Sequence, residues 1–167
     1  MKLLSDIQIR VLDKKLSRSS LETLYSLNQG NSPEVGFISS IEYFSRLFEI
    51  SALSLLVEHQ AEIVGFIICF RENSEYESLN YKYFNENKQK FLYIDRIVIK
   101  SEYRRKGLGT KIYKYLDEIA QKDMLPICCE VNSIPLNQIS LDFHAKNGFL
   151  EVAERNFEDH SVKYLIK

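Results

Sequence analysis

FLYIDRIVIKSEYRRKGLGTKIYKYLDEIAQK, from Phe91 to Lys122, carries the strongest structural signal in this chain. Its first part, FLYIDRIVIK, is an apolar run without Gly or Pro, which predicts a buried strand. In its last part, apolar residues recur at the spacing of one helix face, at Leu108, Ile112, Leu116 and Ile119. We therefore predict a strand, a short basic turn with glycines and a helix, in that order.

The turn in this segment, RRKGLGT, has the features of an anion-binding site. Its glycines let a ligand approach the backbone, and the free amides at the start of the following helix carry a partial positive charge. Arg104, Arg105 and Lys106 add formal charge beside those amides. The spacing excludes a Walker-type loop, and Ile112 replaces the third glycine of a dinucleotide fingerprint. We expect a polyanionic ligand that carries a diphosphate.

The length and charge of the chain limit the kinds of partner. With 167 residues, we expect residues 1–167 to form a single domain with a sizeable core. The 22 basic and 23 acidic residues give a net charge of −1, which argues against a nucleic-acid or membrane-surface partner. The basic turn therefore needs a local explanation.

Cysteine usage and the N-terminal sequence indicate the compartment. Cys69, Cys128 and Cys129 lie in apolar, strand-like runs and suit neither a disulfide framework nor a metal site. MKLLSDIQIRVL has no evident secretion signal, and no segment has the apolar length of a membrane span. We expect a cytoplasmic protein without a bound metal ion.

The remaining periodicities predict a mixed α+β fold with a largely antiparallel central sheet flanked by helices. Before the central segment we expect a strand at 7–11, helices at 17–27 and 39–50, and strands at 52–58 and 62–71. After it we expect a strand at 126–132, a helix at 136–147 and a closing antiparallel pair at 149–155 and 160–166.

Residues 72–90 show no clear periodicity and are predicted to form a long connection. It carries both aromatic and acidic side chains, at Glu75, Tyr76, Glu77, Tyr81, Tyr83, Phe84 and Glu86. One interpretation is a surface loop pinned by its aromatic residues. The other is a lid over an acceptor, because aromatic rings and carboxylates together can hold an amine.

The turn also carries a family pattern, Arg-x-x-Gly-x-Gly at Arg104, Gly107 and Gly109. Between this strand and this helix, the pattern resembles the acetyl-CoA pyrophosphate loop of the GNAT superfamily of N-acetyltransferases. The order of predicted elements is similar to the GNAT fold over nearly the whole chain. A second block resembles another segment of the family, at Asn137, Ser140, Phe143, His144, Gly148 and Phe149. LNQGNSPEVG, YESLNY, FLYIDRIVI and CEVN followed by FHAKNGF resemble a bacterial subgroup of the family.

The resemblance implies a function. It implies acetyl-CoA-dependent transfer of an acetyl group to a primary amine of a small molecule or to an amino group of a peptide or protein. The transfer would be direct, in a ternary complex that holds the amine beside the thioester. The alternative is a non-catalytic module that senses acetyl-CoA. Because GNAT proteins are often dimers, the resemblance also admits a homodimer.

The resemblance also implies the residues that bind acetyl-CoA. Backbone groups of Ile97, Val98 and Ile99 would line the pantetheine, and an amide near Ile97 would stabilise the oxyanion. Asn137 would approach the pantetheine arm or the adenosine-side phosphates. The pyrophosphate would be held by Arg104, Arg105, Lys106, Gly107, Leu108, Gly109 and Thr110. A Cβ atom at Gly107 or Gly109 would then stand where the pyrophosphate approaches.

The sequence does not decide which residue acts as the general acid. In much of the superfamily a Tyr four residues before the Gly-Phe glycine protonates the departing thiolate, and here that position is His144. Imidazole titrates near neutrality and can donate a proton, so His144 is a candidate acid. The alternative is a helix histidine that makes local polar contacts.

The sequence does not decide which group acts as the general base either. Asp95 and Glu130 are carboxylates in otherwise apolar strands, where a charge needs a partner or a purpose. Alternation places Asp95 on the face of Tyr93 and Ile97, subject to any bulge. Asp95 could instead pair with an arginine, Glu130 could bind the amine, and a water chain could serve as the base. We expect the acceptor to contact Tyr76, Asn80, Tyr81 and Tyr93.

Overall fold

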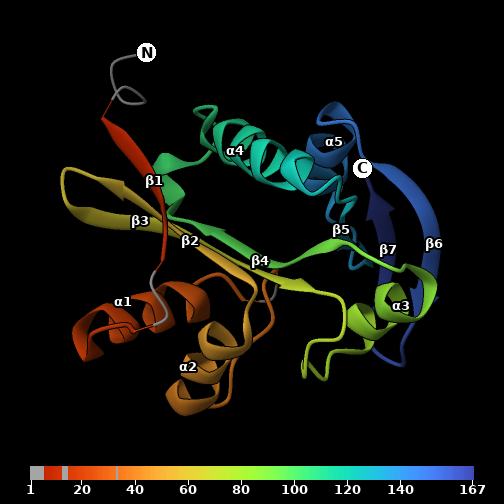
Figure 1. Ribbon diagram of the computed structural model, residues 1–167, viewed down its shortest axis with the longest axis horizontal. Coiled ribbons are helices and arrows are strands. Elements are labelled where there is room, and N and C mark those ends of the chain that lie inside the picture. The colour runs from red at the N-terminus through yellow and green to blue at the C-terminus, as the bar shows by residue number, and fades with distance from the viewer. Residues whose placement is uncertain (1–5, 13–14, 33) are drawn as a thin grey trace.

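The computed structural model describes residues 6–12, 15–32 and 34–167. Figure 1 shows the elements along the chain. The strands are β1 (Ile7–Val11), β2 (Leu53–His59), β3 (Glu62–Arg71), β4 (Leu92–Ile99), β5 (Ile127–Ile134), β6 (Leu150–Asn156) and β7 (Ser161–Ile166). The α-helices are α1 (Arg18–Gln29), α2 (Ile41–Ile50), α3 (Leu79–Asn87), α4 (Leu108–Lys122) and α5 (Gln138–Lys146), and a 3₁₀ turn spans Ser101–Tyr103.

The strands form one sheet in the order β1-β2-β3-β4-β5-β7-β6. Every neighbouring pair is antiparallel except β4 and β5, which are parallel and are connected by α4 as a crossover helix. The predicted mixed, largely antiparallel fold is confirmed. The closing pair is also confirmed, with β7 between β5 and β6.

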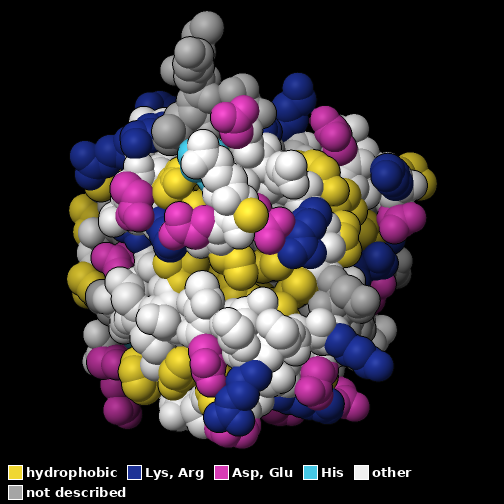
Figure 2. Space-filling model, turned by 90° about the vertical axis from the view of Figure 1, so that its left-hand side faces the viewer, with side chains coloured by type: hydrophobic (Ala, Val, Ile, Leu, Met, Phe, Trp, Pro, Cys, Tyr) yellow, Lys and Arg dark blue, Asp and Glu magenta, His cyan; other side chains and the backbone are white. Residues whose placement is uncertain are grey.

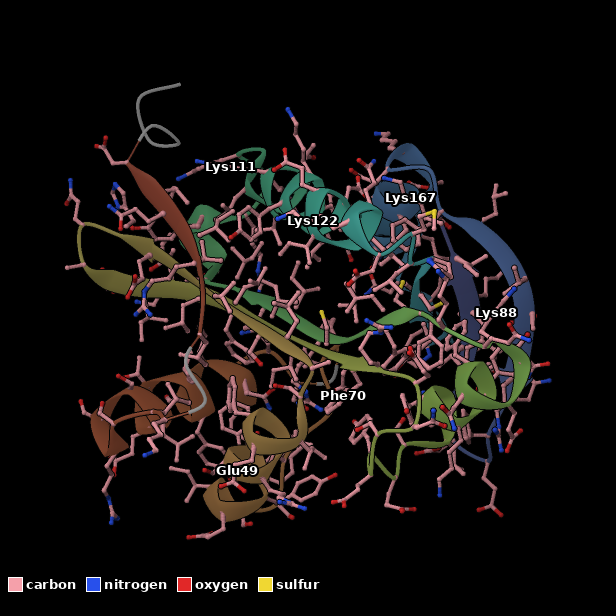
Figure 3. All side chains as sticks on the ribbon, in the orientation of Figure 1. Glu49, Phe70, Lys88, Lys111, Lys122 and Lys167 are labelled. Carbon is pink, nitrogen blue, oxygen red and sulfur yellow. The ribbon has the colours of Figure 1, made fainter. Side chains whose placement is uncertain are left out.

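Helices cover both faces of the sheet. Figure 1 shows α1 and α2 on one face and α4 and α5 on the other. One core packs Phe44, Phe66 and other buried residues beneath α1 and α2, and a second packs Ile67, Ile112 and Leu116 beneath α4. Figure 3 shows side chains filling the space on both sides, with Phe70 on the side of α1 and α2. The alternation of β3 residues between the two cores explains why this strand reads as apolar throughout.

The β4 and β5 strands separate part-way along their length, as Figure 1 shows. Across the described length of both strands, register pairs join only Leu92 to Ile127 and Tyr93 to Cys128. Beyond Tyr93, β4 keeps its pairing with β3 as far as Ile99. One edge of the β4 backbone is therefore left without a neighbouring strand, and this edge positions the site.

A β-bulge lies at Asp95. The β3 residue Ile68 pairs with Arg96, and its neighbour Cys69 pairs with Ile94, so Asp95 is the extra residue. Alternation therefore breaks here: Tyr93 packs into the core beneath α1 and α2, whereas Ile97 packs against the core beneath α4. Asp95 therefore does not share a face with both residues, because the strand has the bulge to which that expectation was subject.

Residues 72–90 contain a helix, α3, so the prediction of a continuous loop was wrong. Ser78 caps the helix by accepting a hydrogen bond from the Tyr81 backbone amide at 3.3 Å. Only Tyr81 and Phe84 are buried in it, which is too short an apolar face to give a periodic signal. Packing of these rings on Tyr93 stabilises the helix, and that contact is not visible in the local sequence.

Charges are mixed on the part of the surface drawn in Figure 2, where basic and acidic side chains lie among a band of hydrophobic ones. Within the part of the chain that the structure describes, no helix is long and apolar enough to cross a membrane.

Candidate active site

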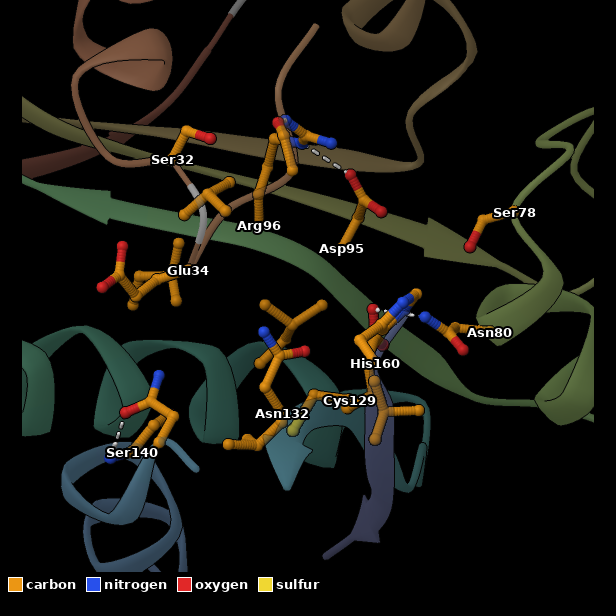
Figure 4. A pocket seen from close by; sticks show the side chains of 18 of the residues that line it. Ser32, Glu34, Ser78, Asn80, Asp95, Arg96, Cys129, Asn132, Ser140 and His160 are labelled. Carbon is orange, nitrogen blue, oxygen red and sulfur yellow. Dashed lines mark hydrogen bonds and ion pairs between the residues drawn. The ribbon is translucent and has the colours of Figure 1, made fainter. Parts of the chain in front are cut away.

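A cavity of about 630 Å³ lies where β4 and β5 separate. Its walls come from β4 (residues 94–97), β5 (residues 129–132), the α1–α2 connection and the turn between β6 and β7. Figure 4 shows Asp95 and Arg96 on one side, Ser78 and Asn80 entering from the α3 side, and Ser140 on a helix opposite. Segments far apart in the sequence therefore meet in one hollow.

The turn before α4 has free backbone amides. Gly107 is the N-cap of the helix and has φ 81°, a left-handed conformation that suits glycine. The first intrahelical hydrogen bond that follows this cap runs from the Lys111 amide to the Gly107 carbonyl at 3.1 Å. The amides of Leu108, Gly109 and Thr110 precede it, so they are available to an anion.

The basic residues of the turn have different surroundings. The Arg104 guanidinium donates to the Ile99 carbonyl at 2.9 Å and to Asn31 Oδ1, so it ties the turn to the end of α1. Arg105 and Lys106 are exposed. Arg104 is therefore suited to hold the shape of the turn, and its two neighbours to meet phosphate charge.

Gly109 has a structural reason to be glycine. A Cβ atom built there would lie 3.1 Å from the ring of Phe143 on α5. The missing side chain lets α4 and α5 approach each other. This Cβ atom would point toward Phe143, so the contact between the two helices gives a second reason for glycine at this position, beside the expected approach of the ligand.

The donor site fits acetyl-CoA on two observations of the chain itself: the unpaired edge of β4 and the free amides before α4. Ile97 lines the cavity, and the backbone of Val98 and Ile99 continues the same edge toward the turn. Asn137 caps α5 through its Oδ1, which accepts from the Ser140 amide at 3.1 Å, and it lines the cavity too.

Glu130 lines this cavity, and no ion pair with an arginine or lysine is found for it among the described residues. Tyr93 Oη donates to Glu130 Oε2 at 2.8 Å, and Asn80 Nδ2 donates to Oε1 at 3.2 Å. Burial, with a smaller contribution from the charge of Asp95, raises the pKa of Glu130 to about 8. This carboxyl group therefore changes its charge near neutral pH.

Asp95 is committed to an ion pair. Its Oδ2 accepts from Arg96 Nε at 2.7 Å, and its Oδ1 accepts from Tyr76 Oη at 2.5 Å. Both side chains of the pair are buried. Arg96 also donates to Asn28 Oδ1 at 2.7 Å and to the Gly36 carbonyl at 3.2 Å, so one guanidinium joins β4 to the end of α1 and to the α1–α2 connection. This is the arginine pairing that the sequence left as the alternative.

The aromatic residues between β3 and β4 mostly serve the core. The Tyr76 ring stacks on Phe70 at 4.2 Å, and Tyr83 stacks on Tyr164 at 4.1 Å. Tyr81 is buried, donates to the Arg71 carbonyl at 2.7 Å and does not line the cavity, so its placement gives no support to a substrate contact.

Two other expected acceptor residues, Tyr76 and Asn80, line the cavity. Tyr93 does not line it but donates a hydrogen bond to Glu130, which does. Tyr164 Oη donates to Asn80 Oδ1 at 2.9 Å, which turns the Asn80 amide nitrogen toward Glu130. Sequence reasoning missed this contribution of Tyr164, since β7 and α3 are far apart in the chain.

His144 is buried in the wall of the cavity. Its Nδ1 lies 2.7 Å from the Ser140 carbonyl, which can only accept, so Nδ1 carries the proton. The Nε2 atom of the neutral ring therefore accepts from Tyr113 Oη at 2.7 Å. Burial lowers the pKa of His144. Tyr113 was not identified from the sequence. The available signal was its hydroxyl group on an apolar helix face, because a buried tyrosine hydroxyl needs a hydrogen-bond partner.

A diphosphate held before α4, with its attached chain along the β4 edge, would bring an acyl group to Glu130. That is the arrangement of an acyl-CoA-dependent transferase. Residues 21–149 match the sequence model of the Acetyltransferase (GNAT) family, and this chain belongs to that family. It is accordingly a GNAT-type N-acetyltransferase, and its donor is acetyl-CoA.

Solved structures share the fold. Naa50 of Arabidopsis thaliana, in complex with the bisubstrate analogue CoA-Ac-MVNAL, has a TM-score of 0.69 at 19% identity, over 97% of this chain and 98% of that chain. The ribosomal-protein-S18-alanine N-acetyltransferase of Escherichia coli has a TM-score of 0.70 at 17% identity, over 96% and 92%. PH1933 of Pyrococcus horikoshii has a TM-score of 0.73 at 21% identity, over 96% and 97%. No curated protein matches the sequence.

Proposed function

We propose that this protein transfers an acetyl group from acetyl-CoA to a primary amine of a small molecule or to an amino group of a peptide or protein, directly in a ternary complex. In this proposal Glu130 receives the proton of the acceptor. The observation that carries it is the placement of Glu130, a partly buried carboxyl group in the cavity where β4 has its open edge.

The chain supplies the donor site in three parts. Bound acetyl-CoA brings a thioester, the carbonyl of which an amine can attack. The free amides of Leu108 to Thr110, with Arg105 and Lys106, hold the diphosphate. The open backbone of Ile97 to Ile99 receives the amide groups of the pantetheine as a neighbouring strand would, and Asn137 approaches the same arm.

The backbone next to the bulge has a further role. The amide of Ile97, or one beside it, polarises the thioester carbonyl and stabilises the negative charge that develops on its oxygen. The Asp95–Arg96 pair fixes the bulge through its hydrogen bonds to Tyr76 and Asn28. These side chains therefore preorganise the strand on which the donor is held.

Glu130 is a better base than Asp95. An amine acceptor is mostly protonated at neutral pH, and it must lose a proton before its nitrogen can attack. The ionised Glu130 carboxylate can bind the ammonium group and take that proton, and a pKa near the working pH suits both steps. Asp95 is already neutralised by Arg96, so it attracts a cation less.

The acceptor enters from the outer part of the cavity. There the α1–α2 connection contributes Glu34 and Phe37, and the β6–β7 turn contributes Asp159 and His160. Tyr76 and Asn80 lie deeper, where they contact Asp95 and Glu130 respectively. The cavity is large enough for a small amine or the terminal residue of a peptide.

The cellular setting belongs to the same proposal. Cys69, Cys128 and Cys129 are buried free thiols, which supports the reducing environment of the cytoplasm. The partners are acetyl-CoA and the amine, without nucleic acid or membrane, and a homodimer remains compatible with this chemistry.

The test is release of the CoA thiol from acetyl-CoA across a panel of amines that includes alkylamines, polyamines and short peptides with a free amino terminus. We expect at least one acceptor to raise release above the blank. Glu130→Gln should lower kcat/KM by about 10²–10⁴-fold while CoA affinity stays unchanged. Glu118→Gln, at an exposed carboxylate of α4, is the matched control and should behave as the wild type. If CoA binds but no amine raises release, the acetyl-CoA sensor replaces the enzyme.

A further inference from the structure

We infer that Tyr113 and His144 form a proton-delivery pair, in which Tyr113 Oη gives the proton to the departing thiolate and His144 resupplies it; this inference rests on the proposed function. Both side chains are buried and both line the cavity at the separation of β4 and β5. Their polar atoms, Tyr113 Oη and His144 Nε2, are 2.7 Å apart. The pair bridges α4 and α5 across the donor side of the site.

The surroundings fix how His144 can act. Its Nδ1 proton is held by the Ser140 carbonyl at 2.7 Å, one helical turn earlier. Rings of Phe143 and Phe149 pack edge-on against the imidazole, so they restrict its rotation. A proton can therefore leave His144 toward the cavity only through Nε2. That atom faces Tyr113 Oη, so His144 acts through the tyrosine.

The charge of His144 controls the direction of the tyrosine proton. A neutral imidazole accepts at Nε2, and the Tyr113 hydroxyl then points at the histidine. A protonated imidazole has a hydrogen on Nε2, so Tyr113 Oη must accept from it. A phenol hydroxyl prefers two positions in the plane of its ring, and the proton then takes the other position, where a group in the cavity can accept it.

The relay balances without placing a charge on the phenol. As the carbon–sulfur bond breaks, its electron pair moves to sulfur. The Tyr113 O–H proton passes to that sulfur, the Nε2 proton of His144 passes to Tyr113 Oη, and His144 is left neutral. An ammonium acceptor loses two protons from its nitrogen: Glu130 takes the first before attack and passes it to water in the cavity, and it takes the second as the amide forms. Glu130 and His144 then re-equilibrate with water in the cavity. The products are an amide and a thiol.

Burial of the two groups agrees with this direction of transfer. Burial raises the pKa of Tyr113 well above its ordinary value, so a lone tyrosinate is unfavourable and a replacement proton is required. Burial lowers the pKa of His144, so the protonated ring is a stronger acid than a free imidazolium. The neighbours that contact or face the pair are Ser140 on α5, Cys129 on β5 and Cys69 on β3, and none of them carries a formal charge at neutral pH.

The first test needs no acceptor. In protein with ¹⁵N-labelled histidine, nitrogen shifts should show His144 as the Nδ1–H tautomer with Nε2 accepting a hydrogen bond. Addition of CoA should move the Nε2 shift, whereas desulfo-CoA should not. Tyr113→Phe should abolish this difference, and Tyr115→Phe, on the same helix, should keep it. An Nε2–H tautomer, or equal effects of CoA and desulfo-CoA in the wild type, would overturn the inference.

The second test uses the best acceptor of the amine panel. Tyr113→Phe and His144→Phe should each lower kcat by at least about tenfold with KM for acetyl-CoA within about twofold, and the double variant should be no slower than the worse single variant. Thermal melting checks folding, and His144→Gln replaces His144→Phe if the latter is unstable. Losses that multiply, or an unchanged kcat in Tyr113→Phe, would overturn the relay. An inactive wild type that still binds CoA would instead defeat the proposed function.

Discussion

Glu130→Gln should change how the stability of this protein depends on pH. The raised pKa of the Glu130 carboxyl, about 8 against 4.5 in the unfolded chain, means that the folded state holds a proton which the unfolded state has lost. Stability must therefore fall as pH rises from about 4.5 to about 8. Below this window both states are protonated, and above it both are ionised.

The size of the effect follows from the shift. One unit of pKa corresponds to about 1.4 kcal/mol, so ionisation of this group costs about 3 kcal/mol of unfolding free energy at pH 7 and about 5 kcal/mol above pH 8. Glutamine keeps the shape and stays neutral. Its amide cannot accept from both Tyr93 and Asn80 on separate oxygens, which adds an offset that does not vary with pH.

The assay is urea denaturation of wild type and Glu130→Gln at pH values between 5 and 9. The difference in unfolding free energy should move in favour of the variant by up to about 1.4 kcal/mol per pH unit up to about pH 8, and then level off. Glu118→Gln should show no such slope. A difference that stays constant from pH 5 to 9 would show that the pKa of the Glu130 carboxyl group is not raised in the folded state.

Three further substitutions separate binding from folding. Gly107→Ala should cost about 1–2 kcal/mol of stability, because its φ is left-handed, and should weaken CoA binding in calorimetry. Gly109→Ala should reduce stability through the contact with Phe143 yet keep CoA affinity within about threefold; the reverse ranking of the two affinities would contradict this assignment. Arg96→Met should cost about 3–5 kcal/mol in denaturant unfolding, because it leaves Asp95 as a buried charge without its partner. A loss below about 1 kcal/mol would show that Asp95 is not held as described.

The strand, turn and helix start that are proposed to hold the donor could be predicted from sequence because they are contiguous. A strand, a glycine turn and a helix start follow one another from Phe91 to Lys122, and their chemistry is local. Gly107 has a left-handed conformation, which agrees with the expectation of a glycine turn before the helix. The contact at Gly109 could not be predicted in this way, since Phe143 approaches it from another helix.

The acceptor half could not be predicted in the same way. The open edge of β4 exists because β5 diverges from it after Tyr93. The residues of the two strands give no local signal of this divergence. The bulge at Asp95 depends on the register with β3, and α3 depends on rings supplied by other elements. Asp95 and Glu130 were identified as unusual because they interrupt apolar strands, but only the fold shows that the first is paired with Arg96 and the second is not.

The pairing of Tyr113 with His144 shows the same limit for the acid. Sequence reasoning placed His144 at the position of the family's tyrosine but had no means to find its partner on α4. A hydroxyl in the middle of a helical apolar face signals only that some partner exists.

The central claim is that Glu130 receives the proton of the acceptor amine during acetyl transfer. The most direct measurement is the pH dependence of kcat/KM for the best amine, in wild type and in Glu130→Gln. In the wild type, the logarithm of kcat/KM should rise with unit slope as pH increases and should level off near pH 8, the pKa of the Glu130 carboxyl group in the free enzyme. In Glu130→Gln this rise toward pH 8 should be absent, and the highest kcat/KM should be lower by at least about 10²-fold. The same rise toward pH 8 in both proteins, with kcat/KM values within about twofold of each other, would contradict the claim.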